Sequence, residues 1–101
     1  MSDFVKVASL ADLKPGQART VDLNGNAVAL YNVEGTVYAT ANTCAHRGGP
    51  LGEGMVSGTS VSCPWHGWEY DVTSGQCAMD PSIAVQKYDV KVEGDDILVA
   101  V

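Results

Sequence analysis

The chain has 101 residues, of which 12 are acidic and 6 are basic, and its formal net charge is −6. This length allows one domain and leaves no room for a second core. The acidic balance argues against nucleic-acid binding, which relies on clustered lysine and arginine. An acidic protein suits a basic docking patch on a partner, although solubility alone accounts for the same charge.

No apolar run approaches the ~20 residues of a membrane-spanning helix, so we expect no membrane association. Residues 1–6 show no basic segment followed by an apolar stretch, which argues against a secretory signal. The cysteine count of three is odd, and nothing in the sequence requires an oxidising compartment. We therefore expect a soluble, cytoplasmic protein.

Turn signals recur about every 8–12 residues, the spacing of an all-β domain. They are Lys14-Pro15-Gly16, Asn24-Gly25-Asn26, Glu34-Gly35-Thr36, Ser57-Gly58-Thr59, Thr73-Ser74-Gly75 and Glu93-Gly94-Asp95-Asp96. The β-prone runs between them predict strands at Phe4–Val7, Ala27–Val33, Thr36–Ala39, Val85–Val92 and Ile97–Val101. Residues 9–13 are predicted to form one short turn with Ser9 as its N-cap.

The middle of the chain has a different composition. Residues 42–82 are rich in Gly, Pro, Cys and Trp and poor in long β-prone runs. We predict a single domain over 1–101, in which residues 1–41 and 83–101 form a β framework and residues 42–82 form a loop-rich insertion. Loops held by a rigid scaffold are common sites of function.

The insertion contains two short motifs, Cys44-Ala45-His46 and Cys63-Pro64-Trp65-His66. They include both histidines of the chain and two of its three cysteines. Each motif therefore offers one thiolate and one imidazole. A binuclear iron–sulfur cluster needs two ligands per iron, and two neutral imidazoles in place of two thiolates make the added electron easier to accept. Such a cluster has a potential of about −150 to +300 mV.

A zinc site, a catalytic pair and simple packing all fit the motifs less well. A structural zinc site also uses two Cys and two His, but usually as a Cys pair followed by a His pair. A catalytic Cys–His pair would leave the second pair without a role. Packing alone rarely places histidines in glycine-rich loops.

The chain resembles the Rieske family, and specifically the small Rieske-type ferredoxins. The resemblance is carried by residues 44–54 (CAHRGGPLGEG) and 63–71 (CPWHGWEYD). It implies an all-β, antiparallel β-sandwich or barrel with an inserted smaller cluster-binding subdomain. It also implies one [2Fe–2S] cluster, with Cys44 and Cys63 on the buried iron and His46 and His66 on the outer iron.

Departures from the respiratory Rieske proteins favour a low-potential, soluble type. Those proteins have an extra Cys beside each ligand pair, where this chain has non-cysteine residues such as Trp65, and a Ser in place of Trp68. Tyr70 matches a tyrosine that bonds a ligand sulfur in the respiratory proteins. A packed Tyr70 with its hydroxyl in water remains an equal alternative.

Further residues are expected to surround the cluster. Gly48, Gly49 and Gly67 would let backbone N–H groups approach the sulfides, although turn geometry alone also accounts for them. Trp65 and Trp68 would shield the cluster or contact a partner, and the alternative is simple packing. Pro81 lies where the family has a third loop covering the cluster. Cys77 is expected to be a small, partly buried apolar residue.

The resemblance implies a one-electron carrier that is not an enzyme by itself. It would take electrons from a flavin-containing ferredoxin reductase and pass them, as a monomer, to a terminal ring-hydroxylating oxygenase in aromatic hydrocarbon catabolism. Residues 63–71 also look like the cluster loop of the oxygenases themselves, but no histidine is left here for their mononuclear iron. The alternatives are a small Rieske subunit of a reductase such as nitrite reductase and, ranked last, a redox sensor.

Overall fold

A computed structural model describes residues 4–23, 25–43, 50–65, 68–78, 80 and 82–100. These residues form ten strands and two single-turn 3₁₀ helices. The strands are β1 (Phe4–Ser9), β2 (Ala18–Leu23), β3 (Asn26–Val33), β4 (Thr36–Ala41), β5 (Met55–Ser57), β6 (Ser60–Ser62), β7 (Glu69–Asp71), β8 (Lys87–Tyr88), β9 (Val90–Glu93) and β10 (Asp96–Ala100). The 3₁₀ helices are η1 (Leu10–Asp12) and η2 (Leu51–Glu53).

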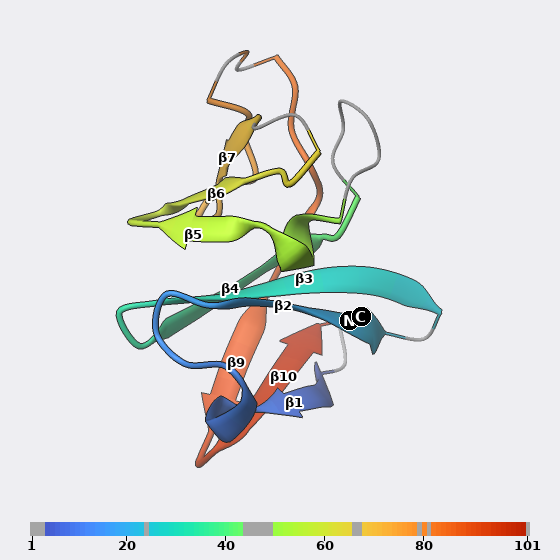
Figure 1. Cartoon of the computed structure of the whole chain (residues 1–101). Helices are drawn as coiled ribbons and strands as arrows, with labels where there is room; N and C mark the ends of the chain where they lie inside the picture. The colour runs from blue at the N-terminus through green and yellow to red at the C-terminus, as the bar shows by residue number, and fades with distance from the viewer. Residues whose placement is uncertain are drawn as a thin grey trace.

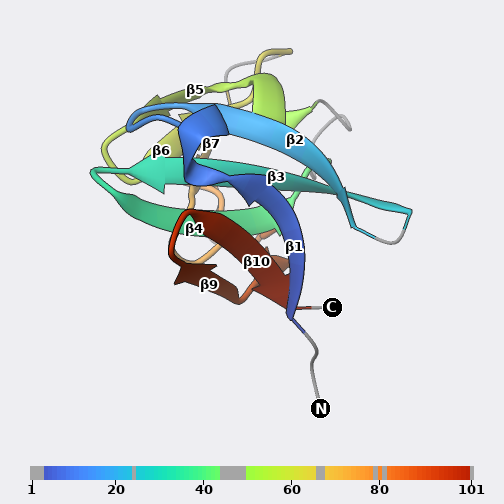
Figure 2. The ribbon, with the colours of Figure 1, turned by 90° about the horizontal axis from the view of Figure 1, so that it is seen from below.

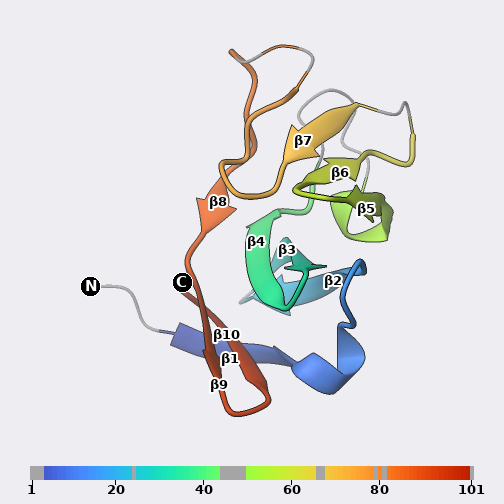
Figure 3. The ribbon, with the colours of Figure 1, turned by 90° about the vertical axis from the view of Figure 1, so that its left-hand side faces the viewer.

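The strands form three antiparallel sheets that follow one another along the molecule (Figure 1). A central sheet, β2-β3-β4-β8, separates the sheet β1-β10-β9 from the small sheet β5-β6-β7 (Figure 3). Strands β1 and β10 come from opposite ends of the chain and lie side by side (Figure 2). The predicted all-β, antiparallel fold class is confirmed.

Strand β3 explains why the central sheet lies in the middle. Its middle residues are buried on both faces, because Val28 and Leu30 pack on one side while Ala29 and Tyr31 pack on the other. We call the two packed regions core A and core B. Core A comprises Ala29, Tyr31, Leu51, Val61, Cys63, Tyr70, Val72, Cys77 and Val85. Core B comprises Leu13, Val21, Leu23, Val28, Leu30, Val37, Ala39, Ile97 and Val99.

The predicted turns are confirmed by backbone conformation. The described glycines with positive φ are Gly16, Gly25, Gly35, Gly58, Gly75 and Gly94, one from each turn signal. Between β3 and β4 the two-residue turn Glu34-Gly35 has φ values of 50° and 95°. Positive φ at both positions matches the right-handed twist of a tight hairpin, and glycine adopts it without steric cost.

Three details of the predicted elements were wrong. The run Val85–Val92 is not one strand: it breaks at Asp89, where the chain leaves the central sheet as β8 and enters the β1-β10-β9 sheet as β9. The sequence analysis did not predict strand β2. Only two of its six side chains, Val21 and Leu23, are buried, too few to give a clear alternation of apolar and polar residues. The turn at Leu10–Asp12 forms, but the Ser9 side chain makes no cap hydrogen bond.

Candidate metal centre

The first motif loop is closed at its base by backbone contacts. Thr43 and Pro50 form an isolated antiparallel bridge, and the N–H of Leu51 donates to the carbonyl of Asn42 at 2.7 Å. The six residues between the bridge partners, 44–49, lie outside the described residues. The loop therefore starts and ends at two adjacent strand-like segments that follow β4 and precede η2.

The second motif lies in the connection between β6 and β7. The pair Ser62–Glu69 ends the ladder, and the N–H of Cys63 then donates to the carbonyl of Trp68 at 2.7 Å. Cys63 is 2% exposed and belongs to core A. Its side chain is therefore held inside the protein at the point where the loop begins.

A third loop is fixed against the same small sheet. Tyr70 and Cys77 form an isolated bridge, and the N–H of Cys77 donates to the carbonyl of Ile83 at 2.8 Å. Within this loop the carboxylate of Asp80 accepts hydrogen bonds from the Ser82 hydroxyl and N–H, and these bonds hold the pKa of Asp80 below its usual value.

The three loops share one buried base. Leu51 follows the first loop, Cys63 begins the second and Cys77 precedes the third, and all three residues belong to core A. In Figure 1 the described ends of these loops lie at the end of the molecule opposite the β1-β10-β9 sheet. Segments that are far apart in the sequence thus meet around a single apolar cluster.

A known domain family matches nearly the whole chain. The family model of the Rieske [2Fe-2S] domain matches residues 3–98. The chain belongs to this family. Its cofactor is a Rieske-type [2Fe–2S] cluster.

Two ferredoxins and a reductase subunit are among the proteins similar to this Rieske domain. The ferredoxin component of the naphthalene 1,2-dioxygenase/salicylate 5-hydroxylase systems of Ralstonia sp is 35% identical, over 90% of this chain and 88% of that protein. The ferredoxin of carbazole 1,9a-dioxygenase from Nocardioides aromaticivorans IC177 has a TM-score of 0.89 and 36% identity, covering 97% of each chain. A putative NADH-dependent nitrite reductase small subunit from Mycobacterium tuberculosis has a TM-score of 0.92 and 26% identity, covering 100% of this chain and 96% of that one.

The predicted site residues of the Rieske domain fall into two groups. Those described are Cys63, Trp65, Trp68 and Tyr70. Those outside the described residues are Cys44, His46, Gly48, Gly49, His66, Gly67 and Pro81. No group of three or more metal-binding side chains occurs within the described part of the chain.

The two tryptophans of the second loop have different surroundings. Trp65 is 58% exposed, whereas Trp68 is half-buried and packs against core A. Tyr70 is 1% exposed, so the alternative that leaves its hydroxyl in water is wrong. The expected partial burial of Cys77 is also wrong in degree, because Cys77 is fully buried in core A.

The residues present fit a Rieske cluster by the chemistry of their donors. A buried cysteine at the base of a loop is poorly placed to attack an external substrate, which suits a ligand better than a nucleophile. Leu51 and Tyr70 are buried in core A and Trp68 packs against it, so the base of the loops is apolar. Two neutral imidazoles would complete the ligand set of two thiolates.

Sequence reasoning missed residues that shape the first loop. Asn42 and Gly52 flank it and are joined by a hydrogen bond of 2.7 Å between the Gly52 N–H and the Asn42 side-chain oxygen. Asparagine and glycine are common in loops, so their presence in this segment did not indicate the contact. Their roles depend on Thr20 of strand β2, which is 22 residues from Asn42 in the sequence.

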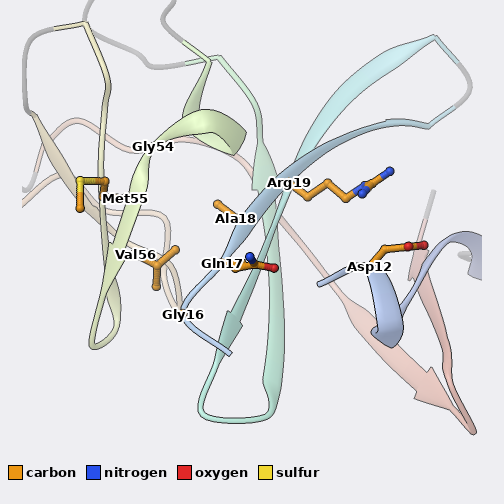
Figure 4. A pocket seen from close by; sticks show the side chains of 8 residues that line it. All are labelled: Asp12, Gly16, Gln17, Ala18, Arg19, Gly54, Met55 and Val56. Atoms are coloured by element: carbon orange, nitrogen blue, oxygen red, sulfur yellow. The ribbon is translucent and has the colours of Figure 1, made fainter. Parts of the chain in front are cut away.

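A broad surface depression is present on the described part of the protein. It has a volume of about 490 Å³ and lies between β2 and β5, where Asp12, Arg19 and the exposed Met55 are among its lining residues (Figure 4). The described residues that line it include no cysteine or histidine. Among the described residues no helix is long and apolar enough to cross a membrane.

Proposed function

We propose that this Rieske domain is a one-electron carrier whose cluster is held by Cys44, His46, Cys63 and His66. The observation that supports it most is the shared base of the three loops in core A, with Cys63 buried among them. The cluster, when bound, supplies reversible one-electron transfer. The chain itself performs no bond chemistry.

The ligands divide between the two irons. Cys44 and Cys63 bind the inner iron, which agrees with the burial of Cys63. His46 and His66 would bind the outer iron, and the exposed Trp65 directly precedes His66 in the sequence. The histidine side would then be the port for electrons. Residues 42–82 form the cluster-binding insertion, and residues 1–41 and 83–101 form the base.

The partners follow from the names of the similar ferredoxins. A flavin-containing ferredoxin reductase donates the electron, and a terminal ring-hydroxylating oxygenase receives it, as in systems of the naphthalene and carbazole dioxygenase type. The protein acts as a monomer in the cytoplasm. Contacts between redox partners are small and transient, typically burying less than about 1,200 Å².

Electron paramagnetic resonance of the dithionite-reduced protein tests this proposal, together with iron and acid-labile sulfide analysis. We expect a rhombic spectrum whose average g value lies below that of an all-cysteine cluster. His66→Cys should lower the reduction potential if the cluster is retained, because it adds a negative ligand. A sample that contains zinc without sulfide, or an unchanged potential in His66→Cys, would contradict the assigned ligation.

A permanent small subunit of a nitrite reductase is the second candidate. The high TM-score with the nitrite reductase small subunit favours it, whereas the higher identity with the dioxygenase ferredoxins favours the carrier. Gel filtration of natively purified protein separates the two. A free carrier elutes as a monomer, and a permanent subunit elutes with a large flavoprotein.

A further inference from the structure

Asn42 connects both ends of the first ligand loop to the central sheet. It directly precedes Thr43 of the bridge that closes the loop. Its backbone carbonyl accepts a hydrogen bond from the N–H of Leu51 at 2.7 Å, on the far side of the loop. Its backbone N–H donates to the carbonyl of Ala27 in β3 at 3.1 Å. The backbone of one residue therefore contacts the sheet and the returning chain.

The side chain of Asn42 adds two further bonds. Its Oδ1 accepts the N–H of Gly52 at 2.7 Å and the hydroxyl of Thr20 at 3.0 Å. An amide oxygen has two lone pairs, so both are used. Asn42 is 8% exposed, and a buried acceptor of this kind keeps its partners in place because leaving either donor unpaired is costly.

Gly52 makes this contact possible. A Cβ at position 52 would fall on the Thr20 Oγ1 and would lie 2.8 Å from the Asn42 Oδ1 and from the Thr20 backbone nitrogen. The backbone at residue 52 therefore lies so close to β2 that no side chain would fit between them. Asn42, Gly52 and Thr20 form one three-residue clamp around the loop base.

We propose that Asn42 is a positioning residue for Cys44 and His46. The inference rests on the proposed cluster ligation and adds the means by which the first loop is held. Asn42, which precedes the loop, holds both Leu51 and Gly52, which follow it, through its backbone carbonyl and its side chain, so the two described ends of the loop stay close together. Ligands held in this way meet the metal without a large loss of entropy at binding.

The chain contains a matched control in Asn32. This asparagine is also buried, at 3% exposed, and its side chain also makes two bonds. Its Nδ2 donates to the carbonyl of Leu13 at 2.8 Å, and its Oδ1 accepts the N–H of Gly35 at 2.8 Å. These bonds support the β3–β4 turn and the segment after η1, and neither involves the three loop bases.

The test compares Asn42→Ala with Asn32→Ala in the cluster-containing protein. The measurements are iron release to a chelator, the g values of the reduced protein and the free energy of unfolding. Loss of groups that orient metal ligands typically weakens metal binding about 10–100-fold. Asn42 acts on the ligands through the ends of the loop, so we expect Asn42→Ala to accelerate iron release by about tenfold, the lower end of that range, and to change the g values. Asn32→Ala should lower only the unfolding free energy.

Two further variants complete the design. Asn42→Asp keeps an acceptor for both donors, although it buries a charge, and should therefore release iron more slowly than Asn42→Ala. Thr20→Val removes one donor and leaves the Gly52 bond, so it should give a smaller acceleration even if Asn42→Ala fails to fold. Equal iron release and g values in Asn42→Ala and Asn32→Ala, or no effect of Thr20→Val, would overturn the inference. A wild-type protein without iron and sulfide would instead refute the proposed cluster.

Discussion

At the scale of single residues, the two tryptophans of the second loop differ in exposure, although their sequence positions look alike. Trp65 is largely in solvent, although exposing an indole has a cost in hydrophobic free energy. Trp68 packs against core A and offers its carbonyl to the N–H of Cys63. An exposed tryptophan that directly precedes the proposed ligand His66 in the sequence is suited to partner contact, because tryptophan often dominates interface energetics.

Trp65→Ala should therefore weaken partner binding, whereas Trp68→Ala should reduce stability. We expect Trp65→Ala to raise the apparent KM for this protein about tenfold or more in a reconstituted reductase–ferredoxin–oxygenase assay, with little change in Tm. Trp68→Ala should lower the free energy of unfolding by about 2 kcal/mol, because it leaves a gap beside core A. Unchanged KM in the Trp65 variant would assign that side chain no docking role.

Tyr31 should make the protein sensitive to alkaline pH. Burial raises the pKa of Tyr31 above its ordinary value of ~10, and the hydrogen bond with Thr40 opposes this only in part. A raised pKa in the folded state means that its contribution to stability is complete below pH ~10 and is lost as pH rises toward the folded-state pKa.

The test measures the free energy of unfolding of wild type and Tyr31→Phe at pH 8 and pH 11. We expect the wild type to lose more stability over this interval. At pH 8 the variant should be less stable by about 1 kcal/mol, because it lacks the hydrogen bond to Thr40. Parallel losses in the two proteins would mean that folding does not raise the pKa of Tyr31.

At the scale of elements, the hairpin β5–β6 illustrates two different demands on glycine. Gly58 lies in the turn with φ +59°, and a Cβ there would meet no atom within 4 Å. Gly54 has an ordinary φ, but a Cβ there would fall on the Ser62 carbonyl oxygen, with the Leu51 oxygen at 3.2 Å. One glycine is needed for its conformation and the other for a close approach of two backbones.

Gly54→Ala should consequently be more damaging than Gly58→Ala. Backbone atoms cannot move aside cheaply, so we expect Gly54→Ala to lower the free energy of unfolding by about 2–3 kcal/mol. Gly58→Ala should cost about 1 kcal/mol, the usual penalty of the left-handed region. Urea denaturation of both variants checks the order, and a Gly58 variant that is the less stable would contradict the contact described for Gly54.

At the scale of the whole molecule, the sheets and the loop region differ in what stabilises them. Both faces of β3 are packed, and β1 is paired with β10, so the base has its own core. The described part of the loop region contains short strands and the buried Cys63, and its loops depend on a few backbone bonds. A bound cluster would join the two motif loops and stabilise this end selectively.

Removal of the cluster should therefore loosen one end of the protein first. Hydrogen exchange of the apoprotein should show the amides of Leu51 and Cys63 exchanging at least about tenfold faster than in the holoprotein. Amides of Leu30 and Tyr31 in β3 should change less, because their residues remain fully buried. Uniform acceleration along the chain would mean that the base does not fold independently of the cluster.

The sequence by itself determined the fold class, the turns and the candidate ligands. Turn glycines are local requirements of backbone geometry, so all six could be located from the residue pattern alone. The candidate ligands could be proposed because metal binding restricts residue type and spacing more strongly than packing does.

Only the tertiary structure decided how these parts meet. The break at Asp89 depends on which sheet offers a free edge, and strand β2 is stabilised by β3 and not by its own pattern. The exposure of Trp65, the burial of Tyr70 and the clamp formed by Asn42, Gly52 and Thr20 depend on contacts between distant segments. Such contacts follow from packing in three dimensions, which periodicity and spacing along one chain do not specify.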